Sequence, residues 1–240
     1  MAEDIAVVVG ATGGLGAALI AALRHDARYA HVVALSRRRP GDWTDDARQT
    51  WLPADLLDDA TLAAAARRIE GLGTPTRVVV ATGLLHAPAV APEKALRALD
   101  AATLALLFQV NASGPALIAK HLLPLTPRDR TSVFAALSAR VGSLGDNALG
   151  GWYGYRASKA ALNMLIRTAA IEHRRTHPLG VCVTLHPGTV ATPLSQPFAA
   201  PGRERFTPPT AAGHILRVLD GLGPDASGGF YGWDGAAIPW

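Results

Sequence analysis

A short apolar run near the start of the chain ends at a cluster of glycines. The run from Ile5 to Val9 is rich in β-branched residues, which is typical of a strand buried on both faces. Four glycines follow between Gly10 and Gly16, and the residues from Ala17 to Leu23 favour a helix. A strand, a glycine turn and a helix start bring backbone N–H groups and the positive end of a helix dipole to one point, where a pyrophosphate binds well. This unit predicts a dinucleotide-binding type of α/β fold.

The same alternation of strand and helix continues along the chain. Further strands are predicted at 31–35, 51–56, 77–81, 131–137, 180–186 and 229–231. Helices are predicted at 58–69, at about 92–123, from near Trp152 onward, and at 210–219. Repeated units of this length predict a parallel sheet with helices on both faces. The expectation is one Rossmann-type domain over residues 1–240, doubly wound around about seven strands.

Composition narrows the class of protein. The net charge of +4 comes from scattered arginines, which suits an enzyme with anionic ligands and gives little reason to expect nucleic acid. The single cysteine, Cys182, cannot form an internal disulfide, which suits a reducing, cytoplasmic setting. Glu3 and Asp4 stand where a signal peptide carries basic residues, and glycines interrupt the apolar run after them, so neither a leader nor a membrane segment is expected. The eight histidines show no metal-ligand spacing, so no metal is expected.

Basic residues follow the second predicted strand, where dinucleotide folds meet the adenosine ribose. An acid at this place selects NAD, but this chain has Ser36, then Arg37, Arg38 and Arg39. Guanidinium groups favour the 2′-phosphate of NADP through forked, permanently charged hydrogen bonds. The sequence therefore predicts NADP, with NAD as the lesser choice. The alternative is a solvated basic loop.

A tyrosine and a lysine lie four residues apart in the helix predicted from near Trp152. Tyr155 and Lys159 therefore share one helix face. A nearby ammonium favours a phenolate and lowers the pKa of the tyrosine, so the pair could exchange a proton with a carbonyl or an alcohol. Alone, this spacing is also typical of an ordinary amphipathic helix.

Polar residues and glycines end most of the predicted strands. Ligands of a parallel sheet bind at the carboxyl ends of its strands, and these ends hold Gly10, Ser36, Asp55, Gly83, Ser138 and Pro187. With these residues at the strand ends, the chain resembles a short-chain dehydrogenase/reductase over nearly its full length. The resemblance rests on Gly10-x-x-x-Gly14-x-Gly16, Asp55-Leu56, Asn111, Ser138, Tyr155-x-x-x-Lys159 and Pro187-Gly188-x-Val190-x-Thr192. Residues 142–153 and 234–240 also resemble the C-factor-like and sniffer-like carbonyl reductase subgroup.

The resemblance implies a role for each motif. Tyr155 would be the general acid/base, and Lys159 would lower its pKa and bind the nicotinamide ribose. Ser138 would bond the substrate oxygen, and Asn111 would hold a water in a proton relay. The residues expected at the cofactor, besides Ser36, Arg37, Arg38, Tyr155 and Lys159, are Gly10, Thr12, Gly13, Gly14, Leu15, Gly16, Asp55, Leu56, Ala81, Thr82, Gly83, Pro187, Gly188, Val190 and Thr192.

Three departures from the family pattern bear on these roles. Val80-Ala81-Thr82-Gly83 replaces a motif with two asparagines, and Thr82 could supply part of the missing bonding. Ser138 is followed by Ala139 where many relatives have a second serine, with Ser143 the next hydroxyl, and Ser138 is the expected active serine. Gly13 stands where NADP-preferring relatives often carry a basic residue, so NADP preference depends on Arg37, with help from Arg38.

These features predict an NADP(H)-dependent oxidoreductase that interconverts an aldehyde or ketone and an alcohol. The alternative is a nucleotide-binding signalling or regulatory protein of the C-factor type with little turnover. A loop over about 189–209 contains Leu194, Pro197, Phe198 and Phe206, which suggests a partly hydrophobic substrate. Relatives form dimers or tetramers, so a homodimer or homotetramer is expected. His86 is expected to be structural or exposed, with a place at the border of the active-site cleft as the alternative, and His186 is expected to satisfy local backbone.

Overall fold

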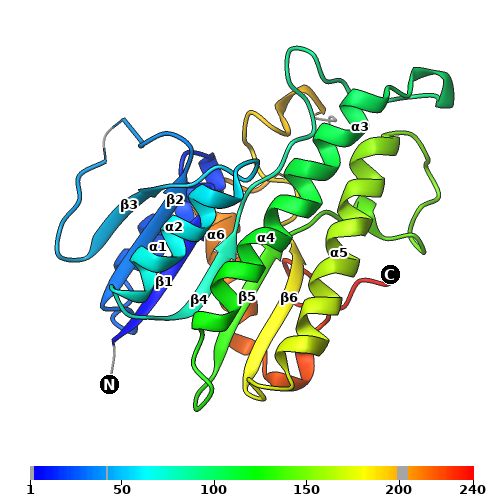
Figure 1. The fold of residues 1–240 in the computed structure, drawn as a ribbon. Coiled ribbons are helices and arrows are strands. Elements are labelled where there is room, and N and C mark those ends of the chain that lie inside the picture. Colours follow the sequence, from blue (N-terminus) through cyan, green and yellow to red (C-terminus); the bar gives the residue numbers. More distant parts are fainter. Residues whose placement is uncertain (1–2, 42, 199–204) are drawn as a thin grey trace.

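Seven parallel strands form the centre of the protein in a computed structural model that describes residues 3–41, 43–198 and 205–240. They are arranged in the order β3-β2-β1-β4-β5-β6-β7, as Figure 1 shows for most of the sheet. The strands are β1 (Asp4–Val9), β2 (His31–Ser36), β3 (Gln49–Pro53), β4 (Thr74–Val80), β5 (Ser132–Leu137), β6 (Gly180–His186) and β7 (Phe230–Gly232). The predicted doubly wound parallel sheet is confirmed.

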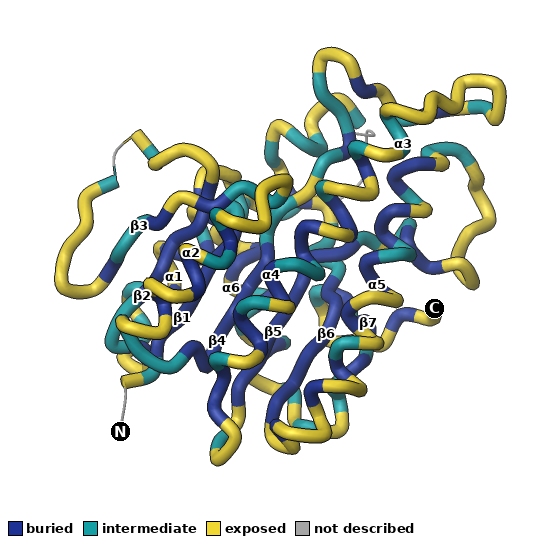
Figure 2. The backbone as a smooth tube through the Cα atoms, in the orientation of Figure 1, coloured by how far each residue is buried: buried dark blue, intermediate teal, exposed yellow. Residues whose placement is uncertain are grey.

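Helices cover both faces of this sheet. They are α1 (Gly14–Arg24), α2 (Asp59–Glu70), α3 (Ala101–Phe108), α4 (Gly114–Leu122), α5 (Tyr153–His173) and α6 (Pro208–Gly221). One core joins the sheet to α2, α4 and α5, and a second core joins the other face to α1 and α6. The strand β1 shows why two cores form: Ile5, Val7 and Val9 enter the first, while Ala6 and Val8 enter the second. Figure 2 shows the strands buried and the outer turns of the helices exposed.

The long helix predicted at about 92–123 is interrupted. Its first part holds only a 3₁₀ turn over Leu96–Ala98, and α3 begins at Ala101, where the Asp100 carboxylate accepts a 2.7 Å hydrogen bond from the Thr103 N–H. A π-helical turn, η2 (Gln109–Ser113), then separates α3 from α4. Such turns are frequent at functional sites. The predicted helix start near residue 92 was therefore wrong, because Asp100 caps the helix and α3 begins at Ala101.

The stretch Ala101–Leu125 meets the length and composition of a membrane-crossing helix. That is a weak indication, because Ile118, Ala119 and Leu122 from this stretch pack into the protein's own core. The apolar run from Ile5 to Leu23 forms β1, the glycine turn and most of α1, as predicted.

Ion pairs tie the elements together near the amino-terminal ends of the strands. Arg77 on β4 is 5% exposed, and its Nη2 lies 2.6 Å from the Asp220 carboxylate at the end of α6. Its Nε donates to the Tyr29 hydroxyl over 3.1 Å. Arg28 also pairs with Asp220 at 3.0 Å, and Arg130 pairs with Asp4 at 2.6 Å. Cationic groups here have carboxylate partners, which stabilises this edge of the sheet.

Candidate active site

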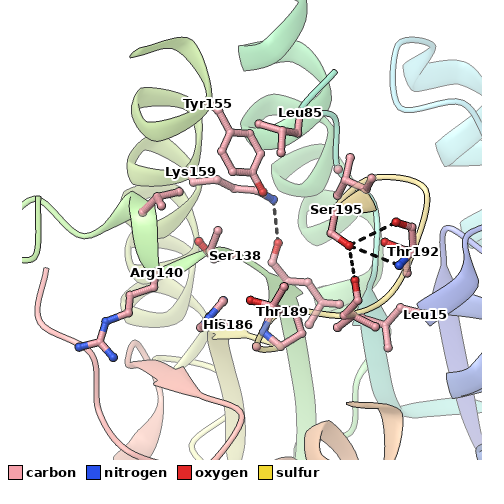
Figure 3. Close-up of a pocket in the computed structure, with 18 of the residues that line it drawn as sticks. Leu15, Leu85, Ser138, Arg140, Tyr155, Lys159, His186, Thr189, Thr192 and Ser195 are labelled. Atoms are coloured by element: carbon pink, nitrogen blue, oxygen red, sulfur yellow. Dashed lines mark hydrogen bonds between the residues drawn. The ribbon is translucent and has the colours of Figure 1, made fainter. Parts of the chain in front are cut away.

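A cavity of about 870 Å³ opens at the carboxyl ends of the strands. It is lined by fourteen of the residues predicted for the site, namely Thr12, Gly13, Gly14, Leu15, Ala81, Thr82, Gly83, Ser138, Tyr155, Lys159, Pro187, Gly188, Val190 and Thr192. Figure 3 shows several of these side chains converging from α5, the loop after β5 and the loop after β6. The predicted residues that do not line it are Gly10, Gly16, Ser36, Arg37, Arg38, Asp55, Leu56 and Asn111.

The glycine turn forms one wall of this cavity. Gly10 has a φ of 97°, and a Cβ there would lie 3.0 Å from the Ala81 carbonyl oxygen, so only glycine fits. The first helical hydrogen bond of α1 runs from the Ala17 N–H to the Gly13 carbonyl over 2.9 Å. The N–H groups of Gly14 and Leu15 precede that bond, so they are available to an anion in the cavity.

At the end of β2 and in the loop after it, Ser36 and Arg39 are bonded to other residues, whereas Arg37 and Arg38 are not paired with a carboxylate among the described residues. The Ser36 hydroxyl donates to the Arg38 carbonyl at 2.7 Å and accepts from the Trp51 indole at 3.0 Å. Arg39 pairs with Asp45 at 2.8 Å. Arg37 and Arg38 are exposed, and neither has a carboxylate partner within the described residues. These two guanidiniums are therefore available to a ligand beyond the cavity.

The other predicted residues outside the cavity have clear structural contacts. The Asp55 carboxylate accepts from the Leu57 N–H over 3.0 Å, which closes a turn. Leu56 packs closely on Gly114, where a Cβ would lie 2.7 Å from the Leu56 Cβ. Gly16 lies so close to the Gly10 carbonyl that a Cβ would collide with it. Their roles at a cofactor stay predictions.

Tyr155 and Lys159 lie on the first two turns of α5 and line the cavity. The Lys159 Nζ donates to the Leu137 carbonyl over 2.8 Å and lies 5.9 Å from the centre of the Tyr155 ring. The Tyr155 hydroxyl has no hydrogen-bond partner in the part of the chain that is described. The phenol is therefore free to meet a ligand, with an ammonium nearby (Figure 3).

Burial controls the pKa of both groups in this structure. It raises the pKa of Tyr155 to about 12 and lowers the pKa of Lys159 to about 8. Desolvation is the cause of the pKa shift at both groups, and the expected effect of Lys159 on the pKa of Tyr155 stays a prediction. The phenol is a neutral proton donor at pH 7.

The two candidate serines have different surroundings. Ser138 is 4% exposed and lines the cavity, and its buried Oγ has no partner within the described residues. The Ser143 Oγ accepts a 3.1 Å hydrogen bond from the Asp146 N–H, and Ser143 does not line the cavity. A buried hydroxyl without a partner is unfavourable unless a ligand satisfies it. The geometry therefore favours Ser138 over Ser143.

Asn111 lies outside the cavity lining and Thr82 within it, and the two side chains differ in how they are bonded. The Asn111 Oδ1 accepts from the Leu84 N–H at 2.7 Å, and its Nδ2 donates to the Leu84 carbonyl at 2.8 Å and the Ser158 hydroxyl at 3.1 Å. This side chain braces the loop after β4 against α5, while the water relay stays a prediction. The Thr82 Oγ1 is buried and has no partner among described residues, so it does not replace the missing asparagine bonds.

Glu93 holds the start of α5, and sequence reasoning missed it. It is 4% exposed; its Oε2 accepts from the Gly154 N–H over 3.1 Å, and its carbonyl accepts from the Trp152 N–H. Trp152 has a φ of 53°, which costs a non-glycine residue about 1–2 kcal/mol. A carboxylate at a helix N-terminus is favourable. Glu93 therefore positions the helix turn that carries Tyr155, although α3, α4 and β5 separate the two in sequence.

Aromatic side chains close one side of the cavity above Tyr155. The Trp152 ring lies edge-on to Tyr155 at 6.2 Å and to Phe198 at 5.0 Å between ring centres. His86 lies 5.5 Å from the Phe198 ring, and its Nε2 lies 3.1 Å from the Pro193 carbonyl oxygen. His86 is thus a structural contact of the loop after β6, as expected. The part of the predicted loop at 199–204 lies outside the described residues.

His186 differs from its expected role. It lines the cavity beside Ser138, and its buried Nδ1 has no partner in the described ranges, so it does not satisfy local backbone through that atom. Burial lowers the pKa of His186 to about 4, with Arg140 adding to the effect. The imidazole is therefore neutral near pH 7 and can bond a ligand. The sequence signal for His186 at the cavity was its position at the end of β6, because Ser138 follows the neighbouring strand β5.

Comparison with known proteins identifies the family. The short chain dehydrogenase profile matches residues 4–201. The chain belongs to the short-chain dehydrogenase family. Among curated relatives of this dehydrogenase, the C-signal protein of Myxococcus xanthus is 40% identical over 147 residues, which cover 61% of this chain and 84% of that protein.

Solved structures share the fold of this chain. The carbonyl reductase Sniffer of D. melanogaster superposes with a TM-score of 0.85 at 24% identity, covering 100% of both chains. A Burkholderia multivorans short-chain dehydrogenase/reductase with bound NADP superposes with a TM-score of 0.80 at 25% identity, also over 100% of both chains. The dehydrogenase is thus similar to C-factor-like and sniffer-like members of the family.

Proposed function

We propose that this dehydrogenase is an NADP(H)-dependent oxidoreductase that interconverts an aldehyde or ketone and an alcohol, with Tyr155 as general acid/base. One observation carries the proposal: the Tyr155 phenol and the Ser138 hydroxyl have no hydrogen-bond partner among the described residues, and both line one cavity together with the glycine turn. Two hydroxyl donors that line one cavity suit a carbonyl oxygen that gains negative charge as it is reduced.

The residues present fit a dinucleotide. The available N–H groups of Gly14 and Leu15 suit its pyrophosphate, and Lys159 borders the nicotinamide end of the cavity. Arg37 and Arg38, which have no carboxylate partner among the described residues, support a preference for the 2′-phosphate. The family relative with bound NADP supports the same choice. When bound, the nicotinamide supplies or accepts a hydride.

The chain's own residues supply the proton and the electrostatics. Tyr155, neutral at pH 7, donates its proton to the carbonyl oxygen during reduction and takes it back during alcohol oxidation. Ser138 donates a hydrogen bond to the same oxygen and fixes its position. The Lys159 ammonium stabilises the phenolate that forms at Tyr155. Trp152 and Phe198 limit water entry, which strengthens these interactions.

The alternative is a nucleotide-binding signalling protein with little turnover. Its support is the 40% identity to the C-signal protein over 147 residues. A binder of this kind has no need of an unpartnered Ser138 hydroxyl beside a buried phenol, so the site geometry favours the enzyme.

The cavity lining, the exposed face of α5 and the single cysteine extend the proposal to the substrate, the assembly and the compartment. The lining residues Leu85, Leu149, Trp152, Leu194 and Phe198 suit a partly hydrophobic carbonyl compound. Exposed apolar side chains on α5, Met164, Leu165 and Ile171, suit a homodimer or homotetramer. The unpaired, buried Cys182 suits the cytoplasm.

A carbonyl panel tests the function. Purified protein is assayed with NADPH and with NADH on aromatic and aliphatic aldehydes and ketones, and nucleotide binding is measured on the same sample. The proposal expects turnover with several substrates and a preference for NADPH. Tight NADPH binding without reduction of any panel member would favour the signalling protein instead.

A further inference from the structure

Arg205 lies where the loop after β6 returns to the sheet. The Ala191 N–H donates to the Phe206 carbonyl at 2.8 Å, and the Phe206 N–H donates to the Thr189 carbonyl at 2.9 Å, so this part of the loop is extended and paired. The Phe206 ring packs on His214 at 4.8 Å and on Trp233 at 4.6 Å. Side chains alternate along an extended segment. Arg205 therefore faces the opposite side, where it lines the cavity.

The Arg205 guanidinium is incompletely bonded. Its Nη2 donates to the Ser195 hydroxyl over 3.2 Å, while its Nε is buried and has no partner among the residues that the structure describes. No carboxylate lies within ion-pair distance of it in the described part of the chain. The other arginines of the cavity differ: Arg140 pairs with Asp146 at 2.7 Å, and Arg156 donates to the Gly151 carbonyl at 2.9 Å. Arg205 as a whole is half-buried, and a buried guanidinium nitrogen without a hydrogen-bond partner is unfavourable unless a ligand binds beside it.

The segment that carries Arg205 packs directly on the glycine turn. A Cβ at Gly14 would lie 3.4 Å from the Thr192 Cγ2 and 3.7 Å from the Pro208 Cγ. The Ser195 hydroxyl that accepts from Arg205 is itself bonded to the Thr192 carbonyl at 3.2 Å. Figure 3 shows Ser195 and Thr192 close to Leu15 at the start of α1. Arg205 is thus connected through Ser195 and Thr192 to the segment that packs on the start of α1.

We propose that Arg205 binds the dinucleotide pyrophosphate from the loop side, opposite the glycine turn. This inference rests on the proposed function, because it assumes that the cavity takes a dinucleotide. Neutral N–H groups then meet the pyrophosphate on one side and a guanidinium meets it on the other. The pyrophosphate is common to NADPH and NADH, so Arg205 contributes equally to both, whereas Arg37 contributes to NADPH alone.

The position of Arg205 also connects cofactor binding to the substrate wall. Ser195 and Phe198 lie on the same loop, and Phe198 contacts Trp152 above Tyr155. An anion held by Arg205 stabilises the loop conformation in which Ser195 is bonded and Phe198 closes the wall. Substrate therefore binds better after the dinucleotide than before it.

Equilibrium binding tests the proposal. Dissociation constants for NADPH, NADH and 2′-AMP are measured by isothermal titration for wild type, Arg205→Ala, Arg205→Lys and Arg37→Ala. Arg205→Ala is expected to weaken NADPH and NADH by the same factor, about 10- to 100-fold. Arg205→Lys is expected to recover part of that loss. Binding of 2′-AMP, which has no pyrophosphate, is expected to stay within about twofold, and its affinity should fall only in Arg37→Ala.

Ser195→Ala is the matched control for a purely structural role. It removes the hydroxyl that bonds the loop but keeps the guanidinium. If Arg205 only braces the loop, both variants lose the same affinity and the salt dependence of binding is unchanged, which would overturn the proposal. A charge contact instead makes NADPH binding less sensitive to ionic strength in Arg205→Ala than in wild type.

The remaining outcomes separate this inference from the function beneath it. Equal dissociation constants for NADPH in wild type and Arg205→Ala would overturn the inference. They would leave the proposed function intact. A rise in the substrate KM with unchanged NADPH affinity would overturn it too, since Arg205 would then meet the substrate. A wild-type protein that binds neither dinucleotide would overturn both proposals.

Discussion

The sheet has an amino edge, where its parallel strands begin, and a carboxyl edge, where they end. Charged groups at these two edges differ in whether they have partners of opposite charge. At the amino edge, the Arg77 guanidinium is buried but is paired with Asp220 at 2.6 Å, and Arg130 is paired with Asp4 at 2.6 Å. At the carboxyl edge, the buried Lys159 ammonium donates to the Leu137 carbonyl at 2.8 Å and has no carboxylate partner within the described part of the chain. The same strands carry both edges, so the difference arises from the side chains and loops at each end.

This contrast indicates which edge serves stability and which serves a ligand. Burying a charge or a hydroxyl without its partner is unfavourable, yet the carboxyl edge does this at Ser138, Lys159 and His186 within one cavity. The amino edge leaves single atoms unsatisfied at Arg77 and His177, and neither residue lines this cavity. Unmet bonding capacity around a cavity indicates a binding site.

The largest effect is expected from Tyr155→Phe at the carboxyl edge. Loss of the phenol removes the proton donor, so turnover of any accepted carbonyl should fall about a thousandfold or more. Phenylalanine keeps the ring contacts with Trp152, so the Kd for NADPH should change by less than about twofold. Steady-state rates and a fluorescence titration on one preparation check both statements. Unchanged turnover would remove Tyr155 from the mechanism.

Lys159→Met and Arg77→Met compare the two edges directly. Lys159→Met removes a buried ammonium whose pKa burial lowers to about 8, so we expect turnover to fall about a hundredfold or more while the free energy of unfolding rises by about 1–3 kcal/mol. Arg77→Met should do the reverse, because it leaves Asp220 with fewer partners: stability falls by about 1–3 kcal/mol and turnover is kept. Denaturant unfolding and steady-state rates measure both. A lower free energy of unfolding in Lys159→Met would contradict the view that the carboxyl edge serves a ligand and the amino edge serves stability.

Ser138→Ala and Ser143→Ala form a second pair within the carboxyl edge. Ser138→Ala removes one of two donors to the substrate oxygen, so kcat/KM should fall about 10- to 100-fold. Ser143→Ala only loosens the turn at Asp146, so kcat/KM should stay within about threefold. Steady-state kinetics with one good substrate decides between them. A greater loss in Ser143→Ala would mean that the loop shifts to present Ser143 instead.

The smallest effects concern two buried histidines, one near each edge. Burial lowers the pKa of His173 and of His186 to about 4, with His177 adding to the effect at His173. The unfolded chain, with a histidine pKa of about 6.5, binds more protons between these values. Stability is therefore fully present above about pH 6.5 and falls as the pH drops toward 4.

Replacing each histidine sharpens this prediction. His173→Phe and His186→Phe should each flatten the loss of stability between about pH 6.5 and 4, measured by denaturant unfolding at several pH values. Only His186→Phe should also alter kcat/KM at pH 7, because His186 lines the cavity and His173 does not. An unchanged acid slope in both variants would show that neither histidine is neutral in the folded protein.

The fold was predictable because strand and helix patterns in this chain are local. The run from Ile5 to Val9 is buried on both faces, and Asp58, where a helix was expected to begin, caps α2. The interruption between residues 92 and 123 was missed because the apolar pattern runs on through the π-helical turn Gln109–Ser113. No composition signal distinguishes such a turn from a regular helix.

The site was predictable where one motif carries it and not where distant segments meet. Tyr155 and Lys159 are one helix turn apart in sequence and in space. Glu93 lies about sixty residues before Gly154, yet it bonds that residue's N–H. Arg205 reaches the cavity only because the loop from Thr189 folds back on Gly14. Such contacts depend on loop conformation, which periodicity and motif spacing do not encode.

A crystal structure of the wild-type protein with NADP tests the central claim most directly. The claim is that the partly bonded groups at the carboxyl edge form a site for a dinucleotide and a carbonyl compound. We expect the pyrophosphate over Gly14 and Leu15 and the nicotinamide next to Tyr155 and Lys159, with Ser138 still open to a substrate. A cavity that stays empty at saturating NADP, or a nucleotide bound elsewhere on the protein, would contradict it.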